Sequence, residues 1–184
     1  MKIQFPNIAI VGTGAMGRGI AQIAAQAGSQ VFLLDANPGA AEAARAALQE
    51  QWNKLVAKGR IEADQATALT ARLHPVKTVA ELAACDLVVE AIVERLDAKQ
   101  ALFVELEGVV RPDAVLATNT SSLSVTAIGA SLKRPERLAG FHFFNPVPLM
   151  KVVEVIAGLK TDPSICTALA AYAKAMGHTP VQAQ

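Results

Sequence analysis

The sequence predicts an α/β fold, in which helices cover a doubly wound, mostly parallel β-sheet and a helical hairpin is inserted into one crossover. Three observations support this prediction. Short apolar runs alternate with longer segments of helical spacing, a glycine-rich turn follows the first run, and 52% of the residues are hydrophobic while only 18% are charged. Central strands of a parallel sheet are buried on both faces and need such a composition. We expect residues 1–184 to form one domain, because 184 residues suffice to bury a core.

The first part of the chain begins with a β-α-β unit. Residues 7–11 and 31–34 are apolar runs that we expect to be strands, and residues 15–27 between them have the spacing of a helix. Residues 38–73 are rich in alanine and in charged residues, with apolar positions near a period of 3.6, and Gly59 interrupts them at a turn. This pattern predicts the helical hairpin.

The second part continues the alternation of strands and helices. We expect strands over residues 87–93, 114–118, 138–144, 152–156 and 179–181, and helices over residues 95–110 and 163–176. The first of these strands contains one charged residue, Glu90. Asp162 before Pro163 is a helix-start signal and Gly177 is a stop signal. Two prolines in residues 145–150 exclude a regular element there and predict a rigid loop.

Charge and cysteine content disfavour several classes of protein. The formal net charge is +1 with scattered cations, which argues against nucleic-acid or membrane partners. Cys85 and Cys166 have neither the spacing of metal ligands nor that of a disulfide framework, so we expect buried thiols, no metal and a reducing cytoplasm. The N-terminus lacks a secretion signal, and no run reaches the ~18 apolar residues of a membrane span.

A GxGxxG motif lies between the first predicted strand and the first predicted helix. Its glycines are Gly12, Gly14 and Gly17, with Ala15 and Met16 at the variable positions. The first glycine permits a tight turn, the second lets a pyrophosphate approach the backbone, and the third lets helix and strand pack closely. This context predicts a Rossmann-type dinucleotide site.

Asp35 ends the second predicted strand, 23 residues after Gly12. An acidic residue there accepts hydrogen bonds from the adenosine ribose and repels a 2′-phosphate. The following Ala36-Asn37-Pro38 offers no cation to receive that phosphate. The sequence therefore favours NAD over NADP as cofactor, although an Asp at a strand end can also be a simple turn residue.

His142 and Glu154 are the candidates for acid–base chemistry. Oxidation of a secondary alcohol by NAD needs a base on the hydroxyl, and His suits that role near neutral pH. Pairing of the two strands about residue 148 would set His142 near Glu154, which would fix the tautomer of the imidazole. A histidine among three phenylalanines is also typical of a core residue, and Glu154 could be a solvated residue on an edge strand.

Several segments together resemble the 3-hydroxyacyl-CoA dehydrogenase family. They are Val89-Glu-Ala-Ile-Val-Glu94, Asn119-Thr-Ser-Ser122, Gly140-Phe-His-Phe-Phe-Asn-Pro-Val-Pro148 and Val153-Glu-Val155, in the family's order. The resemblance implies hydride transfer between NAD and the 3-hydroxyl carbon of a (3S)-3-hydroxyacyl-CoA, in fatty-acid or aromatic-acid degradation. It implies that His142 is the general base or acid and that Glu154 orients it.

The resemblance also implies roles for residues that the sequence pattern leaves open. Ser121 and Asn119 would hydrogen-bond substrate and cofactor, and Asn145 would support the loop, although Asn and Ser after a strand also cap helices. Glu94 and Lys99 match positions near the nicotinamide, yet both fit the charged first turn of a helix equally well.

Three cations of the predicted hairpin, Lys54, Lys58 and Arg60, could meet the phosphates of CoA, because family members bind CoA against this hairpin. A solvated helix face explains such scattered cations more simply. The other two histidines, His74 and His178, have no evident partners, and we assign both to turns.

Members of the family continue into a helical C-terminal domain that supplies a further active-site Asn and usually forms a homodimer. This sequence ends at Gln184, before that domain, so we expect poor turnover by this chain alone. Two other functions remain open. One is a non-catalytic NAD-binding module, and the other is a dehydrogenase of a free hydroxy acid.

Overall fold

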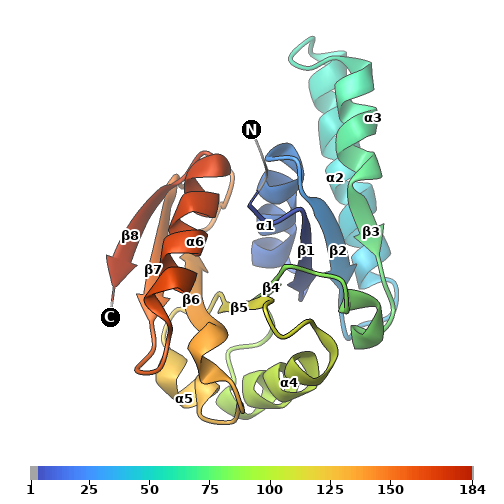
Figure 1. Ribbon diagram of the computed structural model, residues 1–184. Helices are drawn as coiled ribbons and strands as arrows, with labels where there is room; N and C mark the ends of the chain where they lie inside the picture. Colours follow the sequence, from blue (N-terminus) through green and yellow to red (C-terminus); the bar gives the residue numbers. More distant parts are fainter. Residues whose placement is uncertain (1–3, 184) are drawn as a thin grey trace.

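The computed structural model describes residues 4–183, which form one eight-stranded sheet with helices on both faces (Figure 1). The strands are β1 Asn7–Val11, β2 Gln30–Leu34, β3 Leu73–Pro75, β4 Leu87–Glu90, β5 Val115–Thr118, β6 Leu138–Phe143, β7 Val152–Ala157 and β8 Thr179–Ala183. The α-helices are α1 Ala15–Gln26, α2 Ala40–Ala57, α3 Ala63–Ala71, α4 Leu96–Val109, α5 Val125–Gly129 and α6 Pro163–Ala175. Two short 3-10 helices, Val79–Leu82 and Pro135–Arg137, complete the chain.

The order of the strands reverses at the middle of the sheet, between β1 and β4. The order is β3-β2-β1-β4-β5-β6-β7-β8, and all neighbours run parallel except β6 and β7. The chain proceeds outward from β1 to β3 and then returns to place β4 on the other side of β1. Loops that leave the strands diverge at such a reversal, which is where α/β proteins bind ligands. The predicted doubly wound, mostly parallel fold is confirmed.

Alternate residues of each central strand enter two separate cores. Ile8 and Ile10 of β1 pack on the face covered by α1, α2, α3 and α6, in a cluster that includes the fully buried Trp52. Ala9, between them, faces the opposite cluster, which includes Phe103 of α4. Both faces of a parallel strand are therefore apolar, as the continuous apolar runs of the sequence predict.

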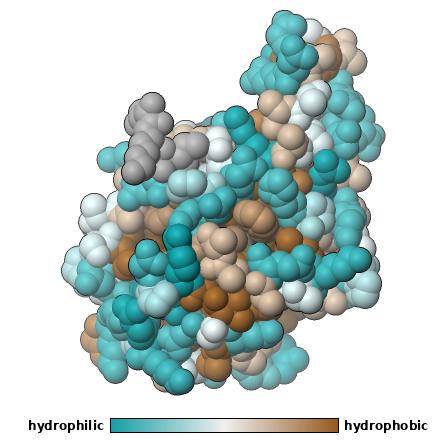
Figure 2. All heavy atoms as spheres, turned by 45° about the vertical axis from the view of Figure 1, so that its right-hand side comes forward, coloured by the Kyte–Doolittle hydropathy of each residue, from teal (hydrophilic) through white to brown (hydrophobic). Residues whose placement is uncertain are grey.

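Two of the helices, α2 and α3, pack together as the predicted hairpin, which projects beyond the sheet (Figure 1). The turn between them contains Gly59 at φ +64°, a left-handed conformation that favours glycine. Hydrophilic side chains cover much of this projecting part (Figure 2). The hairpin is followed directly by β3, which we did not predict. The assignment of His74 to a turn is therefore wrong: it lies in β3, where its Nε2 is 2.7 Å from the Oε1 of Gln30.

The last part of the sheet reverses direction between β6 and β7. The intervening Pro-rich loop contains a cis bond between Asn145 and Pro146. After β7, α6 begins where predicted, because the carboxylate of Asp162 accepts a hydrogen bond of 2.8 Å from the backbone N–H of Ser164. β4 ends at Glu90, earlier than the predicted strand over residues 87–93.

Candidate active site

The glycine motif forms a bare backbone surface at the N-terminus of α1. Gly12 has φ +93°, and a Cβ there would lie 2.5 Å from the carbonyl oxygen of Ala91. A Cβ at Gly17 would lie 1.8 Å from the carbonyl oxygen of Gly12. At Gly14, in contrast, a Cβ would meet nothing within 4 Å, and no described side chain caps the helix. The loop is thus closed on its inner side and open on its outer side, which fits a pyrophosphate bound at the helix N-terminus.

Asp35 is attached to this loop. Its Oδ2 accepts hydrogen bonds from the backbone N–H and the hydroxyl of Thr13, at 2.7 and 2.8 Å, and its Oδ1 accepts one from the backbone N–H of Asn37 at 2.9 Å. Burial works to raise the pKa of Asp35, but these hydrogen bonds from Asn37 and Thr13 outweigh it and lower the pKa. The carboxylate is therefore ionised at neutral pH and fixed beside the glycine loop. The sequence did not single out Thr13.

His142 and Glu154 face each other across the antiparallel pair β6–β7. The register sets His142 opposite Glu154, which confirms the predicted pairing about residue 148. The Nδ1 of His142 is 2.8 Å from the Oε2 of Glu154, and the two side chains are 14% and 37% exposed. A carboxylate at this distance favours the tautomer with the proton on Nδ1 and leaves Nε2 as the acceptor.

One pocket of about 340 Å³ brings together residues from the start of α1, from the segments that follow β4 and β5, and from the end of β6 with the loop after it. Six of the predicted site residues line it, namely Met16, Glu94, Asn119, Ser121, His142 and Asn145. It lies at the carboxyl ends of β4, β5 and β6, close to the reversal of the strand order. Its position links the glycine loop, through Met16, to the pair His142–Glu154.

The carboxylate of Glu94 holds the loop that follows β5. Its Oε1 accepts hydrogen bonds from the hydroxyl of Thr120, from the backbone N–H of Ser121 at 3.0 Å and from the backbone N–H of Ser122 at 3.3 Å. Burial works to raise the pKa of Glu94, but the hydrogen bonds from Thr120 and Lys99 outweigh it and lower the pKa to about 2. Glu94 thus fixes the backbone of Ser121 at the edge of the pocket.

A buried ion pair lies behind this loop. Lys99 and Glu90 are 1% and 0% exposed, and the Nζ of Lys99 is 2.5 Å from Oε1 of Glu90 and 3.2 Å from Oε2 of Glu94. The other oxygen of Glu90 accepts a hydrogen bond of 2.7 Å from the hydroxyl of Thr118. Lys99 thus lies in the first turn of α4, as one of the two alternatives has it, but its ammonium group is buried against Glu90 and Glu94. Glu90 was missed as a site residue, although a glutamate inside a buried apolar strand is itself a signal.

The side chain of His178 contacts the buried side of the Pro-rich loop that carries Asn145. The Nε2 of His178 is 2.9 Å from the carbonyl oxygen of Val147, and both residues are buried. The backbone of His178 closes the turn after α6, because its N–H donates to the carbonyl oxygen of Ala173 at 2.9 Å, while its ring lies inside the protein.

The three hairpin cations lie outside the pocket. Lys54 is paired with Glu50 at 2.7 Å and is 69% exposed, and Lys58 and Arg60 are exposed at the turn. These three cations therefore lie on the surface of the projecting hairpin and do not line the pocket that contains His142.

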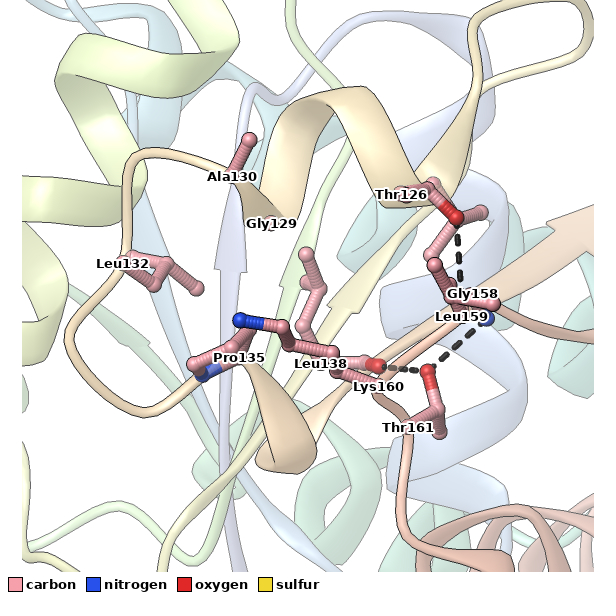
Figure 3. A pocket seen from close by; sticks show the side chains of 11 residues that line it. Thr126, Gly129, Ala130, Leu132, Pro135, Leu138, Gly158, Leu159, Lys160 and Thr161 are labelled. Carbon is pink, nitrogen blue, oxygen red and sulfur yellow. Dashed lines mark hydrogen bonds between the residues drawn. The ribbon is translucent and has the colours of Figure 1, made fainter.

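A second pocket, of about 190 Å³, lies between α5, the start of β6 and the segment after β7 (Figure 3). The hydroxyls of Thr126 and Thr161 at its edge accept hydrogen bonds from the backbone N–H groups of Leu159 and Gly158. No predicted site residue lines it.

Membrane-spanning helices and metal clusters are both absent from the part of the chain that the structure describes. No helix within residues 4–183 is long and apolar enough to cross a membrane. In the same part of the chain, no three or more His, Cys, Asp or Glu side chains are grouped so as to hold a metal ion.

The chain belongs to the family described as "3-hydroxyacyl-CoA dehydrogenase, NAD binding domain", whose profile matches residues 7–184. It is 44% identical to the 3-hydroxyadipyl-CoA dehydrogenase of Escherichia coli (strain K12), over 99% of this chain and 38% of that protein. Among solved structures, 3-hydroxybutyryl-CoA dehydrogenase from Escherichia coli K12 has a TM-score of 0.94 at 44% identity, covering 97% of this chain and 38% of that one. The (S)-3-hydroxybutyryl-CoA dehydrogenase from Ralstonia eutropha has a TM-score of 0.92 at 34% identity, covering 97% and 63%.

Two consequences follow from these comparisons. The resemblance found in the sequence motifs is confirmed, and NAD is confirmed as the cofactor of the family to which this domain belongs. The chain spans 38% of the length of the two Escherichia coli relatives and 63% of that of the Ralstonia eutropha enzyme. The similarity alone therefore does not assign the activity of these whole proteins to the chain.

Proposed function

We propose that the protein transfers hydride between the 3-hydroxyl carbon of a (3S)-3-hydroxyacyl-CoA and NAD. One observation carries this proposal: the hydrogen-bonded pair His142–Glu154 opens on the same pocket as Met16 of the glycine loop. An acid–base pair and a dinucleotide site that share one pocket are what oxidation of a secondary alcohol needs.

In this mechanism His142 moves the proton. Its Nδ1–H donates to Glu154, so Nε2 accepts the proton of the 3-hydroxyl group, and Glu154 stabilises the imidazolium that forms. NAD, when bound, supplies the acceptor of the hydride. Ser121, whose backbone is held by Glu94, places its hydroxyl at the pocket edge to orient the substrate oxygen. Asn119 and Asn145 line the same pocket and support cofactor and loop.

The names of the relatives support an acyl-CoA substrate and the S configuration, since they include a 3-hydroxyadipyl-CoA and an (S)-3-hydroxybutyryl-CoA dehydrogenase. A short acyl chain and a dicarboxylic one both fit this proposal. Lys54, Lys58 and Arg60 are exposed cations on the hairpin and would meet the phosphates of CoA. We place the activity in fatty-acid or aromatic-acid degradation in the cytoplasm, where the buried free thiols of Cys85 and Cys166 stay reduced. We expect the whole protein to be a homodimer.

The test is a turnover assay with acetoacetyl-CoA and NADH, followed by the loss of NADH absorbance. His142→Gln and Glu154→Gln should each lower kcat by about 10²- to 10⁴-fold. They should leave the Kd of NADH, measured by calorimetry, unchanged. His74→Gln is the matched control, because His74 lies in β3 outside the pocket.

Three outcomes would contradict the proposal. Slow turnover is expected of this chain alone, so the deciding comparison is with the His142→Gln protein. A parental rate no higher than that of His142→Gln, with NADH still bound, would favour a non-catalytic module. Turnover of free acetoacetate in preference to its CoA ester would favour a dehydrogenase of a free hydroxy acid. Full activity of the His142→Gln protein would remove the histidine from the mechanism.

A further inference from the structure

The buried ion pair behind the pocket is part of a chain of three charges. Lys99 contacts Glu90 at 2.5 Å and Glu94 at 3.2 Å. The carboxylate of Glu90 accepts hydrogen bonds from Lys99, from the hydroxyl of Thr118 at 2.7 Å and from the backbone N–H of Ile92 at 2.7 Å. These contacts include an ammonium group and a backbone N–H, which can only donate, and such an environment favours the ionised carboxylate. Two carboxylates and one ammonium therefore leave one net negative charge.

This charge lies at the part of the pocket where the nicotinamide ring has to be. Hydride passes directly from carbon to carbon, so the accepting ring must reach the carbon whose hydroxyl His142 deprotonates. Glu94 and His142 line the same pocket. Glu90 and Lys99 lie directly behind Glu94 and are 0% and 1% exposed, so solvent and salt screen their charges weakly.

We propose that the chain Glu90–Lys99–Glu94 shifts the affinity of the site toward the oxidised cofactor. The nicotinamide ring is a cation in NAD⁺ and neutral in NADH, while the rest of the two molecules is the same. A net negative charge beside the ring therefore stabilises bound NAD⁺ relative to bound NADH. This inference rests on the proposed function, because it takes the ring to lie in the pocket of His142.

Glu90 is the positioning residue in this arrangement. If Glu90 carried no charge, Glu94 would be the one carboxylate beside Lys99. The ammonium group of Lys99 would then neutralise Glu94, and no net charge would face the ring. Because Glu90 occupies Lys99 from the buried side, the charge of Glu94 remains uncompensated at the pocket. Glu90 therefore acts on the cofactor without touching it.

The test compares the Kd of NAD⁺ and of NADH by calorimetry in the parental protein and in three variants. Glu90→Gln keeps the size and an acceptor but removes one negative charge, so the ratio Kd(NADH)/Kd(NAD⁺) should fall by about fivefold. Glu90→Gln combined with Lys99→Met restores the net charge of the parental site through Glu94. The ratio should then return to the parental value. Asp97→Asn is the control, because Asp97 begins the same helix but is 68% exposed and pairs with Arg95.

The outcomes separate this inference from the proposed function. Equal weakening of both cofactors by Glu90→Gln would show a purely structural role and overturn the inference. A double variant that keeps the ratio of Glu90→Gln would overturn it as well, because its net charge equals that of the parental chain. Failure of the parental chain to bind either cofactor would contradict the proposed function instead. If Glu90→Gln does not fold, Glu94→Gln removes the same charge at the pocket surface and should lower the ratio likewise.

Discussion

The side chain of Asn119 accepts a hydrogen bond of 2.9 Å, through its Oδ1, from the backbone N–H of Phe143. This bond joins the end of β5 to the residue that directly follows His142 on β6. Strand pairing between β5 and β6 extends from Leu116↔Leu138 to Thr118↔Gly140, so Asn119 continues the connection with its side chain where the register ends. The amide thus holds the end of β6 that carries the imidazole.

We expect Asn119→Ala to lower the free energy of unfolding by about 1 kcal/mol, because it leaves the partly buried N–H of Phe143 without its partner. Turnover should fall as well, since His142 loses its support. Urea unfolding of the two proteins measures the first effect. Asn119→Asp retains an acceptor oxygen and should recover most of the stability. Equal losses in the two variants would mean that the bond contributes nothing.

Substitutions at two glycines of the predicted cofactor loop should affect different properties, stability at Gly17 and cofactor binding at Gly14. Gly17→Ala places a Cβ 1.8 Å from the carbonyl oxygen of Gly12, so the helix must move away from the loop. We expect a loss of about 1–3 kcal/mol in unfolding free energy. A Cβ at Gly14 meets nothing within 4 Å, so Gly14→Val should fold normally, with its side chain on the open side of the loop. Thermal melting together with NADH titration distinguishes the two; normal NADH affinity of Gly14→Val would argue against this loop as the pyrophosphate site.

Asp35 should set the choice between NADH and NADPH. Its carboxylate, held ionised by Asn37 and Thr13, repels the 2′-phosphate of NADPH. Asp35→Asn removes the charge, and we expect the preference for NADH to fall by about tenfold, the equivalent of 1.4 kcal/mol. Calorimetric titration with both cofactors measures it. Asp64→Asn, on an exposed turn of α3, is the control. An unchanged preference would assign the discrimination to other residues.

Glu94 should make stability depend on pH in the acid range. Its pKa is about 2 in the folded chain and 4.5 in its ordinary state, so the lowered pKa stabilises the fold fully above pH 4.5. That contribution is lost as the pH falls from about 4.5 to about 2. The difference in unfolding free energy between the parental chain and Glu94→Gln should therefore be larger at pH 7 than at pH 3. Urea unfolding at the two pH values tests this, and a difference independent of pH would contradict it.

The sequence predicted most of the strands and one contact of the candidate site, but it missed contacts that cross between elements. The facing of His142 and Glu154 followed from a loop centred on residue 148, because antiparallel pairing fixes the register. β3 was not predicted, since Leu73–Pro75 has only three residues and gains its strand geometry by pairing with β2. The buried position of Lys99 in α4 depends on its contact with Glu90 in β4, and no local sequence pattern predicts a contact between these two elements.

The hydrogen bond of His142 with Glu154 spans only 12 residues, whereas that of Ser121 with Glu94 spans 27 and that of Thr13 with Asp35 spans 22. Closing a short loop costs less chain entropy than closing a long one, and hairpins form faster than crossovers between parallel strands. We therefore expect the pair His142–Glu154 to assemble early in folding, as part of the β6–β7 hairpin. The cofactor side of the site then follows when the parallel strands are joined.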